Sequence, residues 1–108
     1  MENETLEEMQ TKMVKNFLDT IILAELRNKS ALSGYDVINF IHKKFDIMIS
    51  SGTVYALLYY MERKGLIEGS WNQRRRVYTL TNKGRETINA ILKSKEEIQG
   101  FMRILIST

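Results

Sequence analysis

The spacing of apolar residues changes twice along this chain of 108 residues. It is helical up to about Lys64, alternates over residues 66–80, and becomes helical again after Thr81. Because the polar tip Asn72-Gln73 divides the alternating stretch, that stretch predicts a two-stranded hairpin. We therefore expect a mainly α (α+β) domain in which the hairpin separates three helices from a long last one.

Two helices are predicted before residue 46. The first spans about residues 5–28 and has two apolar stripes side by side, so it has two faces to bury. The second begins at the N-cap Ser33, where Asp36 three residues later completes a capping-box pattern, and it ends near Phe45.

The third helix is expected over about residues 51–64, with Gly65 as its left-handed stop. One face carries a stripe to be buried, formed by Val54, Leu57, Leu58 and Met61. The other face is free, and its polar or amphipathic side chains can reach phosphates and base edges: Ser51, Thr53, Tyr55, Tyr59 and Arg63. This helix is therefore the best candidate for contact with a partner.

The last helix, capped by Thr81 and reaching residue 106, has more apolar surface than one small domain can cover. The first helix likewise has more apolar surface than the domain can cover. We expect helices 5–28 and 81–106 to form a homodimer interface through Met9, Met13, Phe17, Ile88, Ile91, Leu92, Ile98, Met102, Leu105 and Ile106. All of 1–108 would then be a single domain.

Charge is distributed unevenly along the chain. Residues 27–85 hold eleven basic and four acidic side chains, a net of +7, whereas residues 1–26 have a net of −4 and residues 86–108 are neutral. A basic middle flanked by acidic or neutral ends suits a polyanion such as nucleic acid, although a solvated basic surface is the simpler alternative.

The composition excludes most classes of enzyme. There is no cysteine, which removes disulfides, thiolate nucleophiles and thiolate metal sites. The one histidine, His42, cannot form a zinc site alone, and no nucleophile-elbow pattern accompanies Ser50 or Ser51. We expect no catalysis, no metal and no cofactor.

No apolar stretch reaches the roughly 20 residues that cross a bilayer, so no membrane partner is expected. The first residues are acidic, unlike a secretory signal or a transit peptide. These features predict a cytoplasmic protein.

Three helices, a hairpin and a further helix follow the order of a winged helix-turn-helix, whose third helix enters the major groove. Four spaced motifs lie within residues of about 17–90: SGYDVI at 33–38, SGTVYALL at 51–58, MERKGLI at 61–67 and RRRVYTLTNKG at 74–84. Together they resemble the PadR family of bacterial and archaeal transcriptional regulators. The resemblance implies a DNA-binding core over about residues 15–80.

The chain departs from the family pattern in two places. The stretch Ser50 to Ala56 lacks the two prolines that usually surround the start of the recognition helix, and the wing tip is short. With a single helix expected after the wing, the chain resembles the compact subgroup of the family.

The resemblance implies a homodimeric regulator, with repression by occupancy of a promoter, that binds double-stranded DNA at an inverted repeat. The expected DNA-binding residues are Tyr35, Ser50, Ser51, Thr53, Tyr55, Tyr59, Arg63, Arg74, Arg75 and Arg76. A small-molecule effector between the helices of the dimer is also implied, although the last helix has no tryptophan to stack on one.

Some of these residues have a simpler structural role as an alternative. Tyr35, Tyr55 and Tyr59 are either packing residues or DNA contacts, and Tyr60 is expected to pack. Ser51 and Thr53 are helix caps, phosphate contacts or both.

The wing leaves similar alternatives open. Neighbouring side chains of a strand point to opposite faces, so Arg74 and Arg76 should share one face and Arg75 the other. We expect Arg74 and Arg76 to contact the DNA backbone. Trp71 is expected to pack within the wing, with a ligand pocket as the alternative.

Two functions fit the sequence. The first is a sequence-specific DNA-binding transcriptional regulator. The second is a winged-helix protein–protein interaction module that binds DNA only non-specifically, which salt dependence and sequence preference would distinguish from the first.

Overall fold

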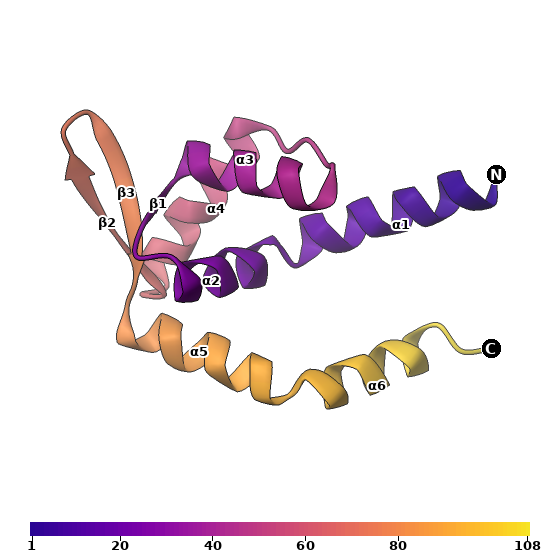
Figure 1. Ribbon diagram of the computed structural model, residues 1–108. Coiled ribbons are helices and arrows are strands. Elements are labelled where there is room, and N and C mark those ends of the chain that lie inside the picture. Colours follow the sequence, from indigo (N-terminus) through magenta and orange to yellow (C-terminus); the bar gives the residue numbers. More distant parts are fainter.

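The computed structural model describes residues 1–108 and confirms a mainly helical chain with a small antiparallel sheet (Figure 1). The elements follow the winged helix-turn-helix order, with an added short strand before the second predicted helix. They are α1 (Glu2–Asn16), α2 (Leu18–Asn28), β1 (Leu32–Ser33), α3 (Gly34–Phe45), α4 (Ser51–Arg63), β2 (Ile67–Asn72), β3 (Arg75–Leu80), α5 (Asn82–Lys93) and α6 (Lys95–Leu105).

The first predicted helix is bent into two, α1 and α2, at Phe17. The backbone of Phe17 leaves helical geometry, with φ −108° and ψ 21°, yet its N–H still donates to Met13 and its carbonyl still accepts from Ile21. The bend lets α2 bury one face in the core while α1 extends beyond it, where only Val14 is buried.

Helix α3 begins at its predicted cap, Ser33, and α4 begins after Ser50. Ser33 Oγ accepts from the N–H of Asp36 at 3.1 Å, and Asp36 Oδ2 accepts from the N–H of Ser33 at 2.9 Å, which completes the capping box. Ser50 caps α4 by accepting from the N–H of Thr53 at 3.2 Å. Gly65, at φ 77°, ends α4 in the expected left-handed conformation.

The hairpin of β2 and β3, called the wing below, is part of a three-stranded sheet in the order β1-β3-β2. Within it Asn72 pairs with Arg75, which leaves a two-residue tip. The third strand, β1, pairs Leu32 with Tyr78 and Ser33 with Val77. Two residues are too few to show an alternating pattern, so the sequence did not reveal this strand.

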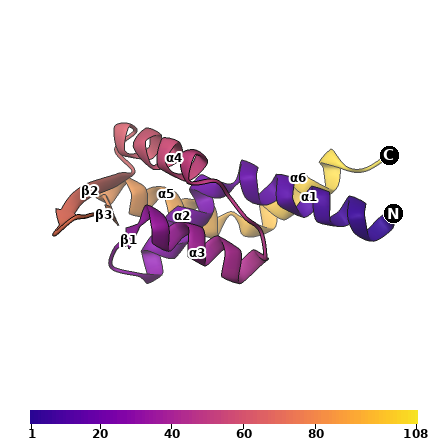
Figure 2. The same cartoon turned by 90° about the horizontal axis from the view of Figure 1, so that it is seen from above.

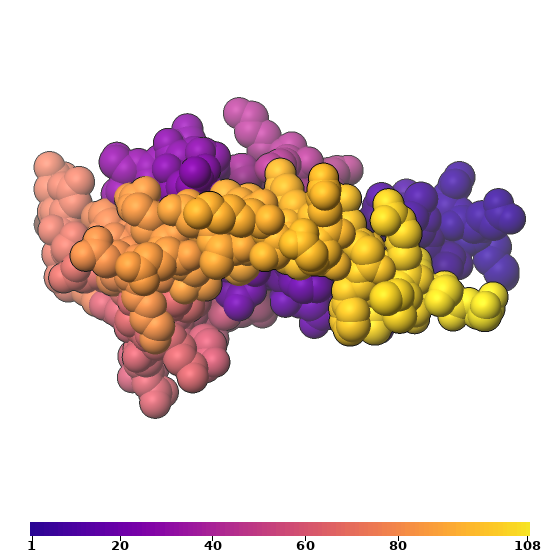
Figure 3. All heavy atoms as spheres, turned by 90° about the horizontal axis from the view of Figure 1, so that it is seen from below, coloured from indigo at the N-terminus to yellow at the C-terminus, as the bar shows by residue number.

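The last predicted helix is also divided, at Ser94, into α5 and α6. Helix α5 packs on α2, where Arg27 Nε donates to Asn89 Oδ1 at 2.7 Å. Helix α6 has no buried residue. In Figure 3 the two helices form a ridge across the face seen from below, and α6 continues past the core.

One cluster of 15 buried apolar residues holds these elements together. It includes Val54, Leu58 and Met61 of α4, as the sequence predicted, while Leu57 is only partly buried. Figure 2 shows that α1 and α6 leave this core at the same end. No helix has both the length and the apolar character needed to cross a bilayer.

Candidate nucleic-acid interface

The start of α4 presents hydroxyl groups and free backbone N–H groups to solvent. Ser50, Ser51 and Thr53 are all exposed, and the hydroxyls of Ser50 and Thr53 lie 2.8 Å apart. Ser50 is therefore the side-chain cap of α4, and Ser51 remains free. A helix N-terminus with such groups favours an anion because its N–H donors and its dipole point outward.

Tyr55 packs against α3 and remains partly accessible to solvent. Its ring lies against the backbone of Gly34 at the start of α3, and 48% of its surface is still exposed. Tyr35 and Tyr59 are exposed, and the Arg63 guanidinium lies 5.6 Å from the centre of the Tyr59 ring. Tyr60, which was expected to pack, is also half exposed, with Lys64 over its ring.

A hollow of about 490 Å³ lies between α3, α4 and the wing. Five of the ten predicted DNA-binding residues line it, namely Tyr35, Tyr55, Arg74, Arg75 and Arg76, together with Ser33, Trp71 and Tyr78. Segments that are far apart in sequence thus meet at one basic and aromatic surface. The other five predicted residues lie on α4 or at its cap, outside the hollow.

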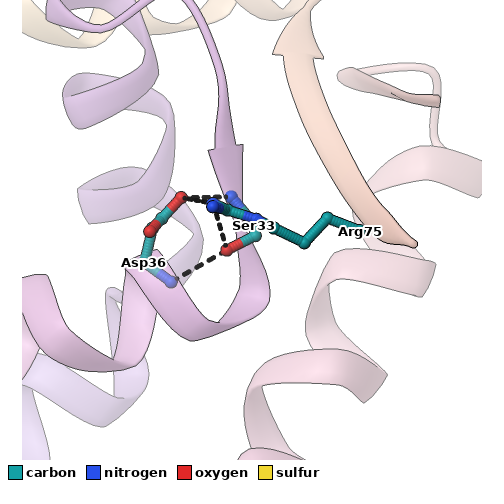
Figure 4. A network of polar contacts seen from close by, with 3 residues as sticks. All are labelled: Ser33, Asp36 and Arg75. Carbon is teal, nitrogen blue, oxygen red and sulfur yellow. Dashed lines mark hydrogen bonds and ion pairs between the residues drawn. The ribbon is translucent and has the colours of Figure 1, made fainter. Parts of the chain in front are cut away.

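Arg75 reaches from β3 to the start of α3, where it joins the capping box (Figure 4). Its Nη2 donates to Asp36 Oδ2 at 2.5 Å and to Ser33 Oγ at 3.0 Å. The same carboxylate oxygen and the same hydroxyl therefore cap α3 and hold the wing. Much of the charge of Arg75 is balanced by Asp36.

Arg76 is held on the other side of the strand, by Glu62 of α4. Arg76 Nη2 donates to Glu62 Oε2 at 2.8 Å, and the backbone N–H of Gly69 donates to the same oxygen at 3.1 Å. The hydrogen bond to Glu62 raises the pKa of Arg76 above its ordinary value, so the guanidinium stays charged. The guanidinium carbon of Arg76, Cζ, lies 5.7 Å from the centre of the Trp71 ring and 5.8 Å from the centre of the Tyr78 ring.

Arg74 differs from its two neighbours. It lies in the tip of the wing, is exposed, and has no ion pair or side-chain hydrogen bond in the structure. The predicted separation of Arg75 from Arg76 is visible in their different partners. Sequence reasoning missed those partners: Asp36 was seen only as a cap, and Glu62 had no assigned role.

The residues expected at a dimer interface fall into three groups according to their exposure. Six are exposed on the single chain: Met9, Met13, Phe17, Ile98, Leu105 and Ile106. Ile91, Leu92 and Met102 are partly buried, and the first two pack against the core. Ile88 has to be corrected, because it is fully buried inside one chain and offers no surface to a second copy.

The exposed apolar surface also includes residues that the sequence analysis did not select, namely Leu6, Phe101 and Ile104. Phe101 stands three residues after Ile98 and four before Leu105, so helical spacing could have identified it. An apolar groove of about 460 Å³ continues this surface along α1, lined mainly by Met13, Val14, Phe17, Ile21, Phe45 and Ile47.

Comparison with protein families gives one match. The model of the transcriptional regulator PadR-like family matches residues 22–90 of the chain, which include α3, α4 and the wing. No curated protein matches the chain in sequence.

Solved structures of similar length share the fold. A transcriptional regulator from Clostridium thermocellum has a TM-score of 0.75 at 22% identity, with 90% of this chain and 97% of that chain covered. A PadR-like transcriptional regulator from Bacillus cereus has a TM-score of 0.74 at 25% identity, with coverages of 91% and 99%. A PadR family regulator from Clostridium difficile has a TM-score of 0.72 at 25% identity, with coverages of 84% and 99%.

Proposed function

We propose that this chain, which belongs to the PadR-like family of transcriptional regulators, binds double-stranded DNA sequence-specifically as a homodimer and acts as a repressor. The observation that carries the proposal is the basic and aromatic hollow between α3, α4 and the wing. No step of this function requires catalysis or a cofactor.

Helix α4 has the dimensions of a recognition helix. Its 13 residues span about 20 Å, long enough to lie in a major groove. With Val54, Leu58 and Met61 in the core, the opposite face is turned outward. Ser51 and Thr53 would hold a phosphate at the N-terminus of α4, while Tyr55 and Tyr59 would lie further along the groove, against phosphates, base edges or thymine methyl groups.

Apolar surface on α1 and α6 supports the dimer. Both helices extend past the core at the same end, and α6 buries nothing within one chain. Exposed apolar patches of this kind are rare on monomers and common at interfaces between identical subunits. A two-fold dimer would present two α4 helices about 34 Å apart, so the operator would be an inverted repeat with half-sites about 10 base pairs apart or a whole-turn multiple.

Selection of bound sites from a pool of random duplexes tests this proposal. The expected result is enrichment of one motif with two-fold symmetry. Enrichment of no motif, with affinity that depends only on salt, would instead support an interaction module that binds DNA non-specifically.

A further inference from the structure

The three consecutive arginines of the wing are not equivalent in their surroundings. Arg75 binds Asp36 and Ser33, and Arg76 binds Glu62, whereas Arg74 has no partner. A guanidinium that is paired with a carboxylate attracts a phosphate less strongly than an unpaired one, because the carboxylate offsets its positive charge and holds it in place. A charge count of the wing therefore overstates the number of phosphates it can contact.

The two carboxylates lie on different helices and also accept backbone N–H groups. Asp36 Oδ2 accepts from Ser33 at the start of α3, and Glu62 Oε2, in the last turn of α4, accepts from Gly69 of β2. Each acid thus connects the wing to a separate helix of the helix-turn-helix. Arg76 is the more enclosed arginine, with 34% of its side chain exposed and two aromatic rings beside it.

We propose that Arg75 and Arg76 are positioning residues that fix the wing against α3 and α4 through Asp36 and Glu62, and that Arg74 alone among the three binds a DNA phosphate. Only the phosphate contact of Arg74 rests on the proposed function. The positioning role of Arg75 and Arg76 does not depend on DNA binding. It also revises the expectation that Arg74 and Arg76 contact the DNA backbone together. The wing would then make one phosphate contact in each subunit. It would also be held at a fixed angle relative to the recognition helix α4.

Three variants with the same loss of charge at adjacent positions test the proposal: Arg74→Gln, Arg75→Gln and Arg76→Gln. Affinity of the full chain for a random-sequence duplex is measured over a range of NaCl concentrations. Arg74→Gln should lower the magnitude of the slope of log K against log salt by about 0.9 per subunit, because one phosphate contact is lost. Arg75→Gln and Arg76→Gln should leave this slope unchanged.

Amide hydrogen exchange of the free protein provides a second measurement that does not involve DNA. The N–H of Ser33 should exchange faster in Arg75→Gln, and that of Gly69 should exchange faster in Arg76→Gln, because the carboxylates that accept these hydrogens lose their fixed position. Arg74→Gln should change neither. Equal exchange in all three variants would show that Arg75 and Arg76 do not fix the wing.

A fourth variant, Glu62→Ala, leaves all three arginines intact and removes the partner of Arg76. The magnitude of the salt slope should rise by about 0.9 per subunit as Arg76 becomes available to a phosphate. A double variant, Glu62→Ala with Arg76→Gln, removes the arginine that Glu62→Ala alone would free. It should return the salt slope to that of the unaltered chain, which general damage to the fold would not do.

The outcomes distinguish the two proposals. If the unaltered chain shows no salt-dependent binding to any duplex, the proposed function and the role of Arg74 fail, while hydrogen exchange still decides whether Arg75 and Arg76 fix the wing. If Arg75→Gln or Arg76→Gln lowers the slope as much as Arg74→Gln does, the positioning role is wrong.

Discussion

The Tyr55 ring occupies the space into which a side chain at Gly34 would extend. A Cβ atom built on Gly34 would lie 2.4 Å from Cε1 of Tyr55 and 2.9 Å from its hydroxyl oxygen. Close approach of α3 and α4 thus depends on a missing side chain at the first residue of α3. The contact with Gly34 also fixes the Tyr55 ring at the edge of the hollow that we assign to DNA binding.

Gly34→Ala is predicted to reduce DNA affinity more than it reduces stability. The new methyl group meets the outer end of the Tyr55 side chain, which can swing away, so the cost in stability should stay near the lower end of the about 1–3 kcal/mol typical of overpacking. Displacement of the ring should still weaken binding. Thermal unfolding and DNA titration of the same variant measure the two effects.

Gly84→Ala provides the contrast, because its new Cβ would lie 2.0 Å from the carbonyl oxygen of Leu66. Backbone cannot swing away as a side chain can, and the start of α5 would have to move away from the turn between α4 and β2. We expect a loss of about 3 kcal/mol in unfolding free energy, well above that of Gly34→Ala. Equal losses in the two variants would contradict this account of the close contacts.

Tyr55→Ala is predicted to weaken binding to the selected duplex by about 1–3 kcal/mol while the dimer and the helical dichroism persist. Tyr60→Ala is the matched control, because Tyr60 is as exposed as Tyr55 on the same helix but does not line the hollow. If both variants bind equally well, Tyr55 does not contact DNA. If Tyr55→Ala unfolds the chain, its packing against Gly34 is its main role.

The α4 region shows what the sequence could predict. The ends of the helix, three of the four residues of its buried stripe and its left-handed stop at Gly65 follow from local spacing and capping chemistry, and the structure agrees. The bends at Phe17 and Ser94 could not be predicted from the sequence. Apolar spacing continues across both positions, so nothing local signals that the helices bend there.

In the candidate site, the contacts that could not be predicted join residues that are far apart in the sequence. Arg75 and Asp36 are 39 residues apart, and their contact depends on the pairing of β1 with β3, which the sequence did not reveal. Spacing predicted that Arg75 and Arg76 lie on opposite faces of the strand, as their different partners show. It could not predict that two of the three arginines already have carboxylate partners.

The dimer prediction concerns α6, which contributes nothing to the buried core of one chain. Replacing Ile98 and Leu105 by aspartate should therefore dissociate the dimer while the helix-turn-helix core stays folded. Sedimentation equilibrium and far-ultraviolet dichroism measure the two properties. Gln99→Asp, an exposed polar position next to Ile98, is the control for added charge.

The unaltered protein sets the reference for that experiment. It should sediment as a dimer at micromolar concentration. A monomer at that concentration would show that the exposed faces of α1 and α6 do not join two copies of this chain.

The measurement that tests the central claim most directly is the ratio of affinities for the selected duplex and for a scrambled duplex of the same composition, at one physiological salt concentration. A sequence-specific regulator should bind the selected duplex at least about 1,000-fold more tightly. A ratio close to one, or no binding to either duplex, would contradict the assignment of the hollow between α3, α4 and the wing to specific DNA recognition.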